Sequence, residues 1–170
     1  MAFSAPTGSG RAVIFVDLDR LKAVNDELGH AAGDQVIVTA ADQIRSALRT
    51  GDFVGRLGGD EFLVISPRVT SAAQAMEIAK RISAALTIAV ALGSNTVELR
   101  ASVGVVWTME ALDTDTLIAR ADSAMYESKR LGDHGVTLYA EADIDSGSAR
   151  NDANRAQPRA LIYPPGSPTI

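Results

Sequence analysis

Three acidic residues occupy positions where a side chain is difficult to bury in a core. Asp17 directly follows the apolar run of residues 13–16, and Asp60 and Glu61 lie in a turn between two short apolar segments. Carboxylates at strand ends and turns are hard oxygen ligands of the kind that Mg²⁺ combines with substrate phosphates. Gly59 precedes these acids and has no side chain, so a nucleotide can approach the backbone of the turn closely. The pattern therefore indicates a site for a divalent cation and a triphosphate.

The segment after the first acid adds groups that can bind an anion and a base. Residues 19–21 open a predicted helix, whose N-terminal dipole favours negative charge. Lys22 and Asn25 are three residues apart and share a face of this helix, and Asp34 follows a glycine turn. A lysine can contact phosphate oxygens. A carboxylate accepts hydrogen bonds from N1 and the N2 amine of guanine, whereas adenine would leave it unpaired. This segment favours a guanine nucleotide.

Each of these residues also has an ordinary structural explanation. An aspartate after a strand usually belongs to a turn or a helix cap, a Gly-Gly-Asp turn is usually only a hairpin, and an exposed lysine is usually solvated. The order and spacing of the whole series favour the functional interpretation. The series is Phe15-Val16-Asp17-Leu18-Asp19, Lys22, Asn25-Asp26, Gly29-His30, Gly33-Asp34 and Arg56-Leu57-Gly58-Gly59-Asp60-Glu61-Phe62.

Apolar spacing predicts the elements that must position these residues. Residues 13–16 are an unbroken apolar run, which predicts a central strand buried on both faces. The hairpin makes at least one strand pair antiparallel, so the alternation of strands and helices predicts an α/β fold with a mixed sheet. The further predicted elements are helices over 21–28, 34–48, 71–91 and 113–131, and strands over 53–57, 62–65, 97–107 and 136–139.

Composition restricts the class of protein. A chain of 170 residues, 46% of them apolar, suits one domain with a substantial core. The net charge of -5 argues against broad binding to nucleic acid or anionic lipid, and the absence of cysteine excludes disulfides and thiolate metal sites. No apolar stretch is long enough to span a membrane. We therefore expect a cytoplasmic protein with one domain over 11–142 and flexible termini or linkers at 1–10 and 143–170, the latter rich in proline.

The series of motifs resembles the GGDEF family, the diguanylate cyclases, over roughly residues 12–140. The likeness includes residues 121–126 and Lys129 in the last predicted helix. The resemblance implies a palm-like mixed sheet of about five strands flanked by helices, related to nucleotidyl cyclase catalytic domains. It also implies an enzyme in which two GTP molecules, one on each of two facing domains, condense to cyclic di-GMP and release two pyrophosphates. A homodimer is then needed for catalysis.

The resemblance assigns roles residue by residue. Asp60 would accept the proton of the attacking 3′-hydroxyl in addition to binding a metal ion. That ion, Mg²⁺ or alternatively Mn²⁺, would lower the pKa of the hydroxyl and neutralise charge on the phosphates. The catalytic set is Asp60 and Glu61, and the metal-binding set is Asp17, the backbone carbonyl of Leu18, Asp60 and Glu61. The substrate-binding set is Asn25 and Asp34 for guanine, His30 and Gly59 beside the nucleotide, and Lys22 and Lys129 for the terminal phosphates.

A second site is implied by residues 49–52, five residues ahead of the hairpin motif. Arg49 and Asp52 resemble the RxxD inhibitory site of the family, where cyclic di-GMP binds and slows its own synthesis. Arginine offers paired contacts to phosphate or guanine, and Asp52 could accept from guanine. The structural alternative is an arginine that complements the dipole at the end of a helix.

Two departures from the family pattern keep other functions open. Asp133 stands in Gly132-Asp133-His134, where the family usually has Gly-Arg-Asn, and residues 1–11 lack the usual Asp-x-Leu-Thr stretch. Both favour an alternative, a catalytically weak or inactive domain that binds GTP or cyclic di-GMP and regulates a partner. The intact Gly-Gly-Asp-Glu-Phe motif opposes it. A cyclase with an adenine-containing product is a third option, against which Asp34 argues.

Overall fold

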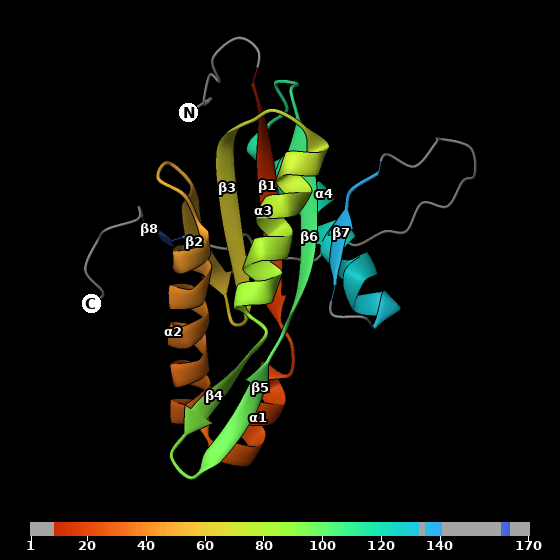
Figure 1. The fold of residues 1–170 in the computed structure, drawn as a ribbon. Coiled ribbons are helices and arrows are strands. Elements are labelled where there is room, and N and C mark those ends of the chain that lie inside the picture. The colour runs from red at the N-terminus through yellow and green to blue at the C-terminus, as the bar shows by residue number, and fades with distance from the viewer. Residues whose placement is uncertain (1–8, 133–134, 141–160, 164–170) are drawn as a thin grey trace.

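The computed structural model describes residues 9–132, 135–140 and 161–163, and these form a sheet with helices on both faces (Figure 1). The elements follow one another in the order β1 (Gly10–Leu18), α1 (Leu21–Leu28), α2 (His30–Ala47), β2 (Phe53–Gly58), β3 (Glu61–Val69), α3 (Ala72–Ala85), β4 (Ile88–Leu92), β5 (Asn95–Leu99), β6 (Ala101–Thr108), α4 (Thr114–Leu131), β7 (Val136–Leu138) and β8 (Leu161–Tyr163).

The main sheet has the strand order β7-β6-β1-β3-β2-β8. Strand β1 lies near its middle and pairs antiparallel with both β3 and β6, whereas β6 and β7 are parallel. The predicted mixed sheet with a central first strand is therefore confirmed. Strands β4 and β5 form a separate two-stranded sheet, which lies beside α1 at one end of the molecule (Figure 1).

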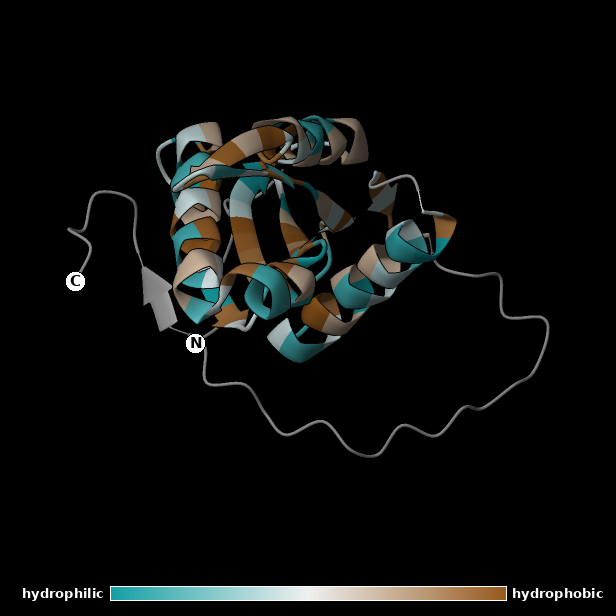
Figure 2. Cartoon of the chain, turned by 90° about the horizontal axis from the view of Figure 1, so that it is seen from below, coloured by the Kyte–Doolittle hydropathy of each residue, from teal (hydrophilic) through white to brown (hydrophobic). Residues whose placement is uncertain are grey.

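Strand β1 carries an unbroken apolar run over residues 12–16, where both of its faces are covered. Ile14 and Val16 belong to the core beneath α1, α2 and α3, while Val13 and Phe15 belong to a smaller core beneath α4. Figure 2 shows the hydrophobic strands enclosed between helices on the two sides. Residues of β1 at odd positions therefore face α4, an alternation that also fixes the direction of Asp17.

The structure corrects the predicted boundaries of the third helix and the fourth strand. The helix predicted over 71–91 ends at Ala85, and residues 88–92 form β4. Within β4, Val90 and Leu92 are buried and Ala89 and Ala91 are exposed, but this alternation is short and alanine-rich, so it also suits a helix. The strand predicted over 97–107 is two strands in different sheets, β5 and β6, which separate at Arg100.

Two further boundaries differ from the prediction. Helix α2 begins at His30 rather than Asp34, so Gly33 lies inside the helix instead of ending a turn. Within the segments predicted as flexible termini or linkers, Gly10 begins β1 and residues 161–163 form β8, which pairs with β2. The other terminal residues, 1–8, 141–160 and 164–170, lie outside the described part of the chain, as do Asp133 and His134. The domain limits themselves stay a prediction. Over the described residues, no helix combines the length and apolarity needed to cross a membrane.

Candidate active site

Pairing of β1 with β3 brings Asp17 beside the hairpin turn. Asp17 lies directly opposite Glu61 in the antiparallel register, and the amide of Leu18 donates a hydrogen bond of 3.0 Å to the carbonyl oxygen of Asp60. Directly opposed residues of an antiparallel pair project from the same face of a sheet. Asp17 and Glu61 therefore share the face that α4 covers, and Asp60 lies next to them in the turn.

The hairpin turn is shaped by a glycine and held by an arginine. Gly59 has a φ of +49°, in the left-handed region that glycine adopts without strain. Arg56 Nε donates to the carbonyl oxygen of Gly59 at 3.1 Å. The predicted Gly-Gly hairpin is confirmed, and Asp60 is presented at its tip.

Asp17 is a nearly buried carboxylate, with 6% of its surface exposed. Lys129 Nζ, from α4, donates to Asp17 Oδ1 at 2.6 Å. Burial raises the pKa of Asp17 most strongly, the bond to Lys129 opposes that increase, and the nearby Asp60 and Asp19 raise the pKa further, so the net pKa lies above its usual value. Burial is the largest single effect on the pKa of Lys129 and lowers it, but the bond to Asp17 and the negative charges of Asp17, Asp60 and Asp19 together outweigh burial, so the net pKa is raised.

A serine and a second aspartate complete this end of the sheet. Ser102 of β6 lies opposite Asp17 on the other side from Glu61, and its hydroxyl donates to Asp19 Oδ1 at 3.0 Å. The amide of Asp19 donates to the carbonyl oxygen of Arg100 at 2.9 Å. Asp17 therefore lies on β1 between β3 and β6, with Asp19 after it in the chain and Glu61 opposite it.

The donor chemistry of this region fits a hard divalent cation. Asp17, Asp60 and Glu61 supply carboxylates from neighbouring strands and their turn, and the raised pKa of Asp17 reflects desolvation and negative charge that a cation would relieve. Among the described residues, however, no three acidic, histidine or cysteine side chains are gathered closely enough to hold a metal ion. A cation would have to draw these carboxylates together and release Asp17 from Lys129.

Helices α1 and α2, which carry the candidate guanine-binding residues Asn25 and Asp34, pack closely against each other. A Cβ on Gly33 would collide with the side-chain amide of Asn25, so the glycine allows the two helices to approach. Asn25 therefore lies against the residue that precedes Asp34. Lys22, His30 and Asp34 are exposed, and His30 is the first residue of α2.

The chain matches the family described as "Diguanylate cyclase, GGDEF domain" over residues 4–134. It belongs to the GGDEF family. The GGDEF chain is 46% identical over 147 residues to diguanylate cyclase TpbB of Pseudomonas aeruginosa, a match that covers 79% of this chain and 34% of that protein. It thus spans about a third of the length of this curated relative.

Solved GGDEF domains have the same fold. The structure of the TpbB (YfiN) GGDEF domain is 41% identical with a TM-score of 0.73, covering 78% of this chain and 84% of that one. The GGDEF domain of DgcB from Caulobacter crescentus, solved in complex with c-di-GMP, is 29% identical with a TM-score of 0.72 and coverages of 78% and 79%. The predicted palm-like fold, related to nucleotidyl cyclases, is confirmed.

The RxxD residues of this GGDEF domain form a closed loop between α2 and β2. Asp52 is fully buried, and its carboxylate accepts hydrogen bonds from the Arg49 backbone amide at 3.1 Å and from Arg49 Nε at 3.3 Å. Arg49 Nη2 donates to the carbonyl oxygens of Pro67 and Arg68. Asp52 is thus used inside the protein, and the partly exposed Arg49 is the member of the pair that a ligand can reach.

Sequence reasoning assigned no role to the side chains of Arg56, Ser102 and Asp19, although Arg56 and Asp19 stand in the motif series. Asp19 could have been found from the sequence, because it lies two residues after Asp17 and side chains two residues apart in an extended chain project from the same face. Ser102 had no comparable signal, because its contact with Asp19 joins residues 83 positions apart.

Proposed function

We propose that this GGDEF domain is a diguanylate cyclase that converts two GTP molecules into cyclic di-GMP and two pyrophosphates. The observation that carries the proposal is the β1–β3 register, which sets Asp17 opposite Glu61 and beside Asp60 with Lys129 in contact. Membership of the family supports the same activity. Mg²⁺ is the proposed ion, because hard carboxylates and phosphates are its usual ligands.

The residues of the domain divide the work of the reaction. Asn25 and Asp34 orient guanine at the junction of α1 and α2. Lys22 and Lys129 bind the terminal phosphates, which requires Lys129 to leave Asp17. Asp17, the Leu18 carbonyl, Asp60 and Glu61 would hold a divalent ion. That ion would lower the pKa of the 3′-hydroxyl and neutralise charge on the leaving pyrophosphate.

Each bond-forming step follows the same course. The 3′-oxygen of one GTP attacks the α-phosphorus of the other, its proton passes to Asp60, and the bond from the α-phosphorus to the pyrophosphate oxygen breaks. The step occurs twice to close the ring. Because each domain offers one guanine-binding junction and one acidic edge, two copies must face each other, so we propose a homodimer as the active form.

The experiment is a turnover assay at increasing concentrations of the purified chain with GTP and Mg²⁺, following pyrophosphate and cyclic di-GMP. We expect a rate that rises faster than linearly with protein concentration and is lost in Asp60→Ala and Glu61→Gln. Glu77→Gln removes an exposed carboxylate on α3 and is the matched control with unchanged rate. A strictly linear rate would remove the facing-copies mechanism.

Product inhibition at Arg49 is proposed as a second property of the domain. Asp52 holds the Arg49 backbone and guanidinium, and the exposed part of that guanidinium can bind a phosphate or guanine of cyclic di-GMP. Arg49→Ala should weaken binding of cyclic di-GMP while GTP still binds. Unchanged affinity for cyclic di-GMP would retire the inhibitory assignment.

A regulatory module that binds GTP or cyclic di-GMP without turnover is the second candidate. It is favoured by one observation, the ion pair in which Lys129 engages the carboxylate that a metal would need. The two candidates differ in a single outcome of the turnover assay. Nucleotide binding with no pyrophosphate at any protein concentration would select the regulatory module.

A further inference from the structure

Arg100 lies at the junction of β5 and β6 and projects from the face of the sheet that carries Asp17. Its neighbours Leu99 and Ala101 are buried in the core beneath α1, α2 and α3. Gly104, an even-numbered residue of β6, packs against the backbone of α4, where a Cβ would collide. Because side chains alternate between faces along an extended chain, Arg100 points toward the side of α4.

Backbone contacts place Arg100 next to the start of α1. Leu18 and Ala101 are the last opposed pair of the β1–β6 ladder. Beyond that pair, the Asp19 amide donates a hydrogen bond to the Arg100 carbonyl oxygen. Helix α1 begins two residues after Asp19. Arg100 is therefore positioned beside both the acidic edge and the helix N-terminus where a triphosphate would bind under the proposed function.

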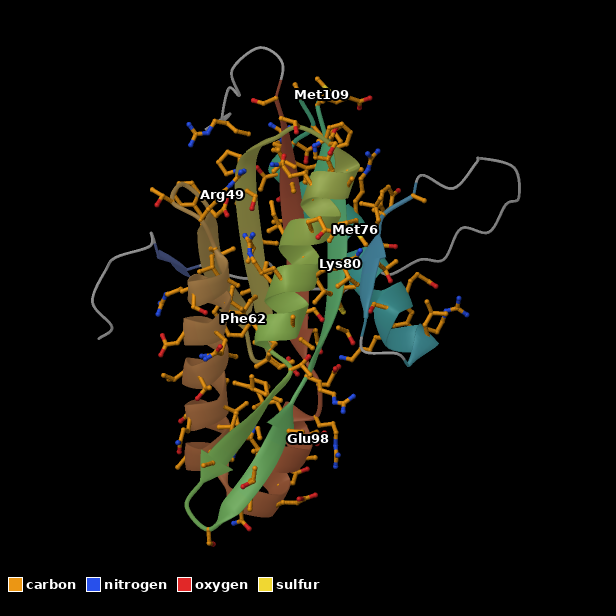
Figure 3. All side chains as sticks on the ribbon, in the orientation of Figure 1. Arg49, Phe62, Met76, Lys80, Glu98 and Met109 are labelled. Atoms are coloured by element: carbon orange, nitrogen blue, oxygen red, sulfur yellow. The ribbon has the colours of Figure 1, made fainter. Side chains whose placement is uncertain are left out.

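The guanidinium of Arg100 can exchange its present partner, Glu98, for another anion. Its side chain is 48% exposed and contacts Glu98 at 3.2 Å, and the Glu98 side chain is 76% exposed. Ion pairs between exposed side chains contribute little stability, so a stronger anion can displace Glu98. A phosphate is such an anion, because arginine binds two of its oxygens at once. Figure 3 shows Glu98 at the end of the molecule opposite Arg49, so the pair is separate from the RxxD loop.

The acidic edge needs such a cation. Asp17, Asp19, Asp60 and Glu61 all lie close to the strand ends, whereas Lys129 is held by Asp17. A triphosphate adds further negative charge to this region. The charge of the four carboxylates and the triphosphate exceeds that of Lys22, Lys129 and a divalent ion together, and a further cation on the same face relieves the excess.

We propose that Arg100 is a phosphate-binding residue of this domain, which exchanges Glu98 for the β- or γ-phosphate of the bound nucleoside triphosphate. The proposal rests on the proposed function of the site. It goes beyond that function because it assigns a chain-specific role in triphosphate affinity to a residue outside the motif series.

Calorimetric titration with 3′-deoxy-GTP, 3′-deoxy-GDP and 3′-deoxy-GMP in Mg²⁺ tests the proposal, since these ligands bind without reacting. For Arg100→Gln we expect about tenfold weaker binding of the triphosphate and little change for the monophosphate. Arg100→Lys should recover part of the loss because it keeps the charge. Arg45→Gln breaks a comparable ion pair on α2, with Asp42, and should bind all three ligands normally.

The outcomes separate this proposal from the proposed function. Equal losses for the triphosphate and monophosphate, or no loss for either, would overturn the role of Arg100 while leaving the cyclase proposal intact. If the unmodified chain binds none of the three ligands, both proposals fail together. Glu98→Gln supplies an independent check, because removal of the competing carboxylate should strengthen triphosphate binding, and weaker binding would count against the exchange.

Discussion

Two regions of this domain hold an aspartate with an exposed cation, and they use the pair differently. In one, Lys129 contacts Asp17 at 2.6 Å with side-chain exposures of 48% and 8%. In the other, Arg49 contacts Asp52 at 3.3 Å with exposures of 41% and 1%. The exposures are similar, so burial of the acid alone does not separate a reactive site from a structural one.

The surroundings of the two acids distinguish them. The Asp17 pair joins β1 to α4, and the neighbouring Asp60 and Asp19 make the site more negative. The Asp52 pair is local, three residues apart, and the same carboxylate also accepts the Arg49 amide. Asp17 therefore has a partly exposed lysine partner and excess negative charge around it, which suits exchange of that partner for a ligand, whereas Asp52 closes a loop.

The largest expected effect is on turnover in Asp17→Asn. An amide of the same shape cannot supply the anionic ligand, so we expect cyclic di-GMP formation to fall by on the order of a hundredfold or more. Folding should be little affected, because the substitution removes a charge that is costly to bury. Turnover and thermal unfolding of the same preparations check this, and retained turnover would show that Asp17 is not needed for the reaction.

A smaller effect, on stability instead of turnover, is expected in Asp52→Asn. The change weakens the bonds that close the loop after α2, and we expect a loss of about 1–3 kcal/mol in the free energy of unfolding. Asp42→Asn alters an exposed pair with Arg45 and should cost less than about 0.5 kcal/mol. Urea unfolding measures both. Equal stability of the two variants would contradict the structural role of Asp52.

The smallest effect is a dependence of stability on pH. Because the pKa of Asp17 is raised in the folded protein, its ionisation destabilises the fold, and stability is lost as pH rises from the ordinary carboxyl pKa of about 3.9 through the raised value. In urea unfolding without divalent ions, the free energy of unfolding of Asp17→Asn should therefore increase relative to that of the unmodified chain as pH rises.

Asp113 should affect the pH dependence of stability in the direction opposite to Asp17. The hydroxyl and amide of Thr116 hold its pKa below the usual range at the start of α4. Its contribution is present above the ordinary pKa and is lost as pH falls through the lowered one. Asp113→Asn should therefore lose stability relative to the unmodified chain as pH rises, and the same trend for both variants would contradict the assigned environments.

The sequence was informative where one local pattern had one structural solution. The apolar run before Asp17 predicted a central strand because both faces of β1 are covered, and the Gly-Gly turn predicted the hairpin. Local patterns were ambiguous around residues 86–92, where alanine-rich sequence suits a helix or a strand. The pattern therefore predicted a single helix over 71–91, where the structure has α3 followed by β4.

Features that depend on long-range packing could not be predicted. The contact of Lys129 with Asp17 joins residues 112 positions apart, and Arg100 gains its position from the β1–β6 ladder. The resemblance to the RxxD site led to the expectation that Asp52 could accept from guanine, and nothing in the sequence indicated that the loop buries this side chain completely. The roles of the site residues stay predictions that the experiments above address.

The most direct test of the central claim is a Mn²⁺ titration followed by electron paramagnetic resonance, with 3′-deoxy-GTP present. The acidic edge should bind Mn²⁺ in the unmodified chain and in Asp52→Asn, and this binding should be lost in Asp17→Asn. Equal Mn²⁺ binding by Asp17→Asn and the unmodified chain would contradict the claim that Asp17 and its neighbours hold the cation.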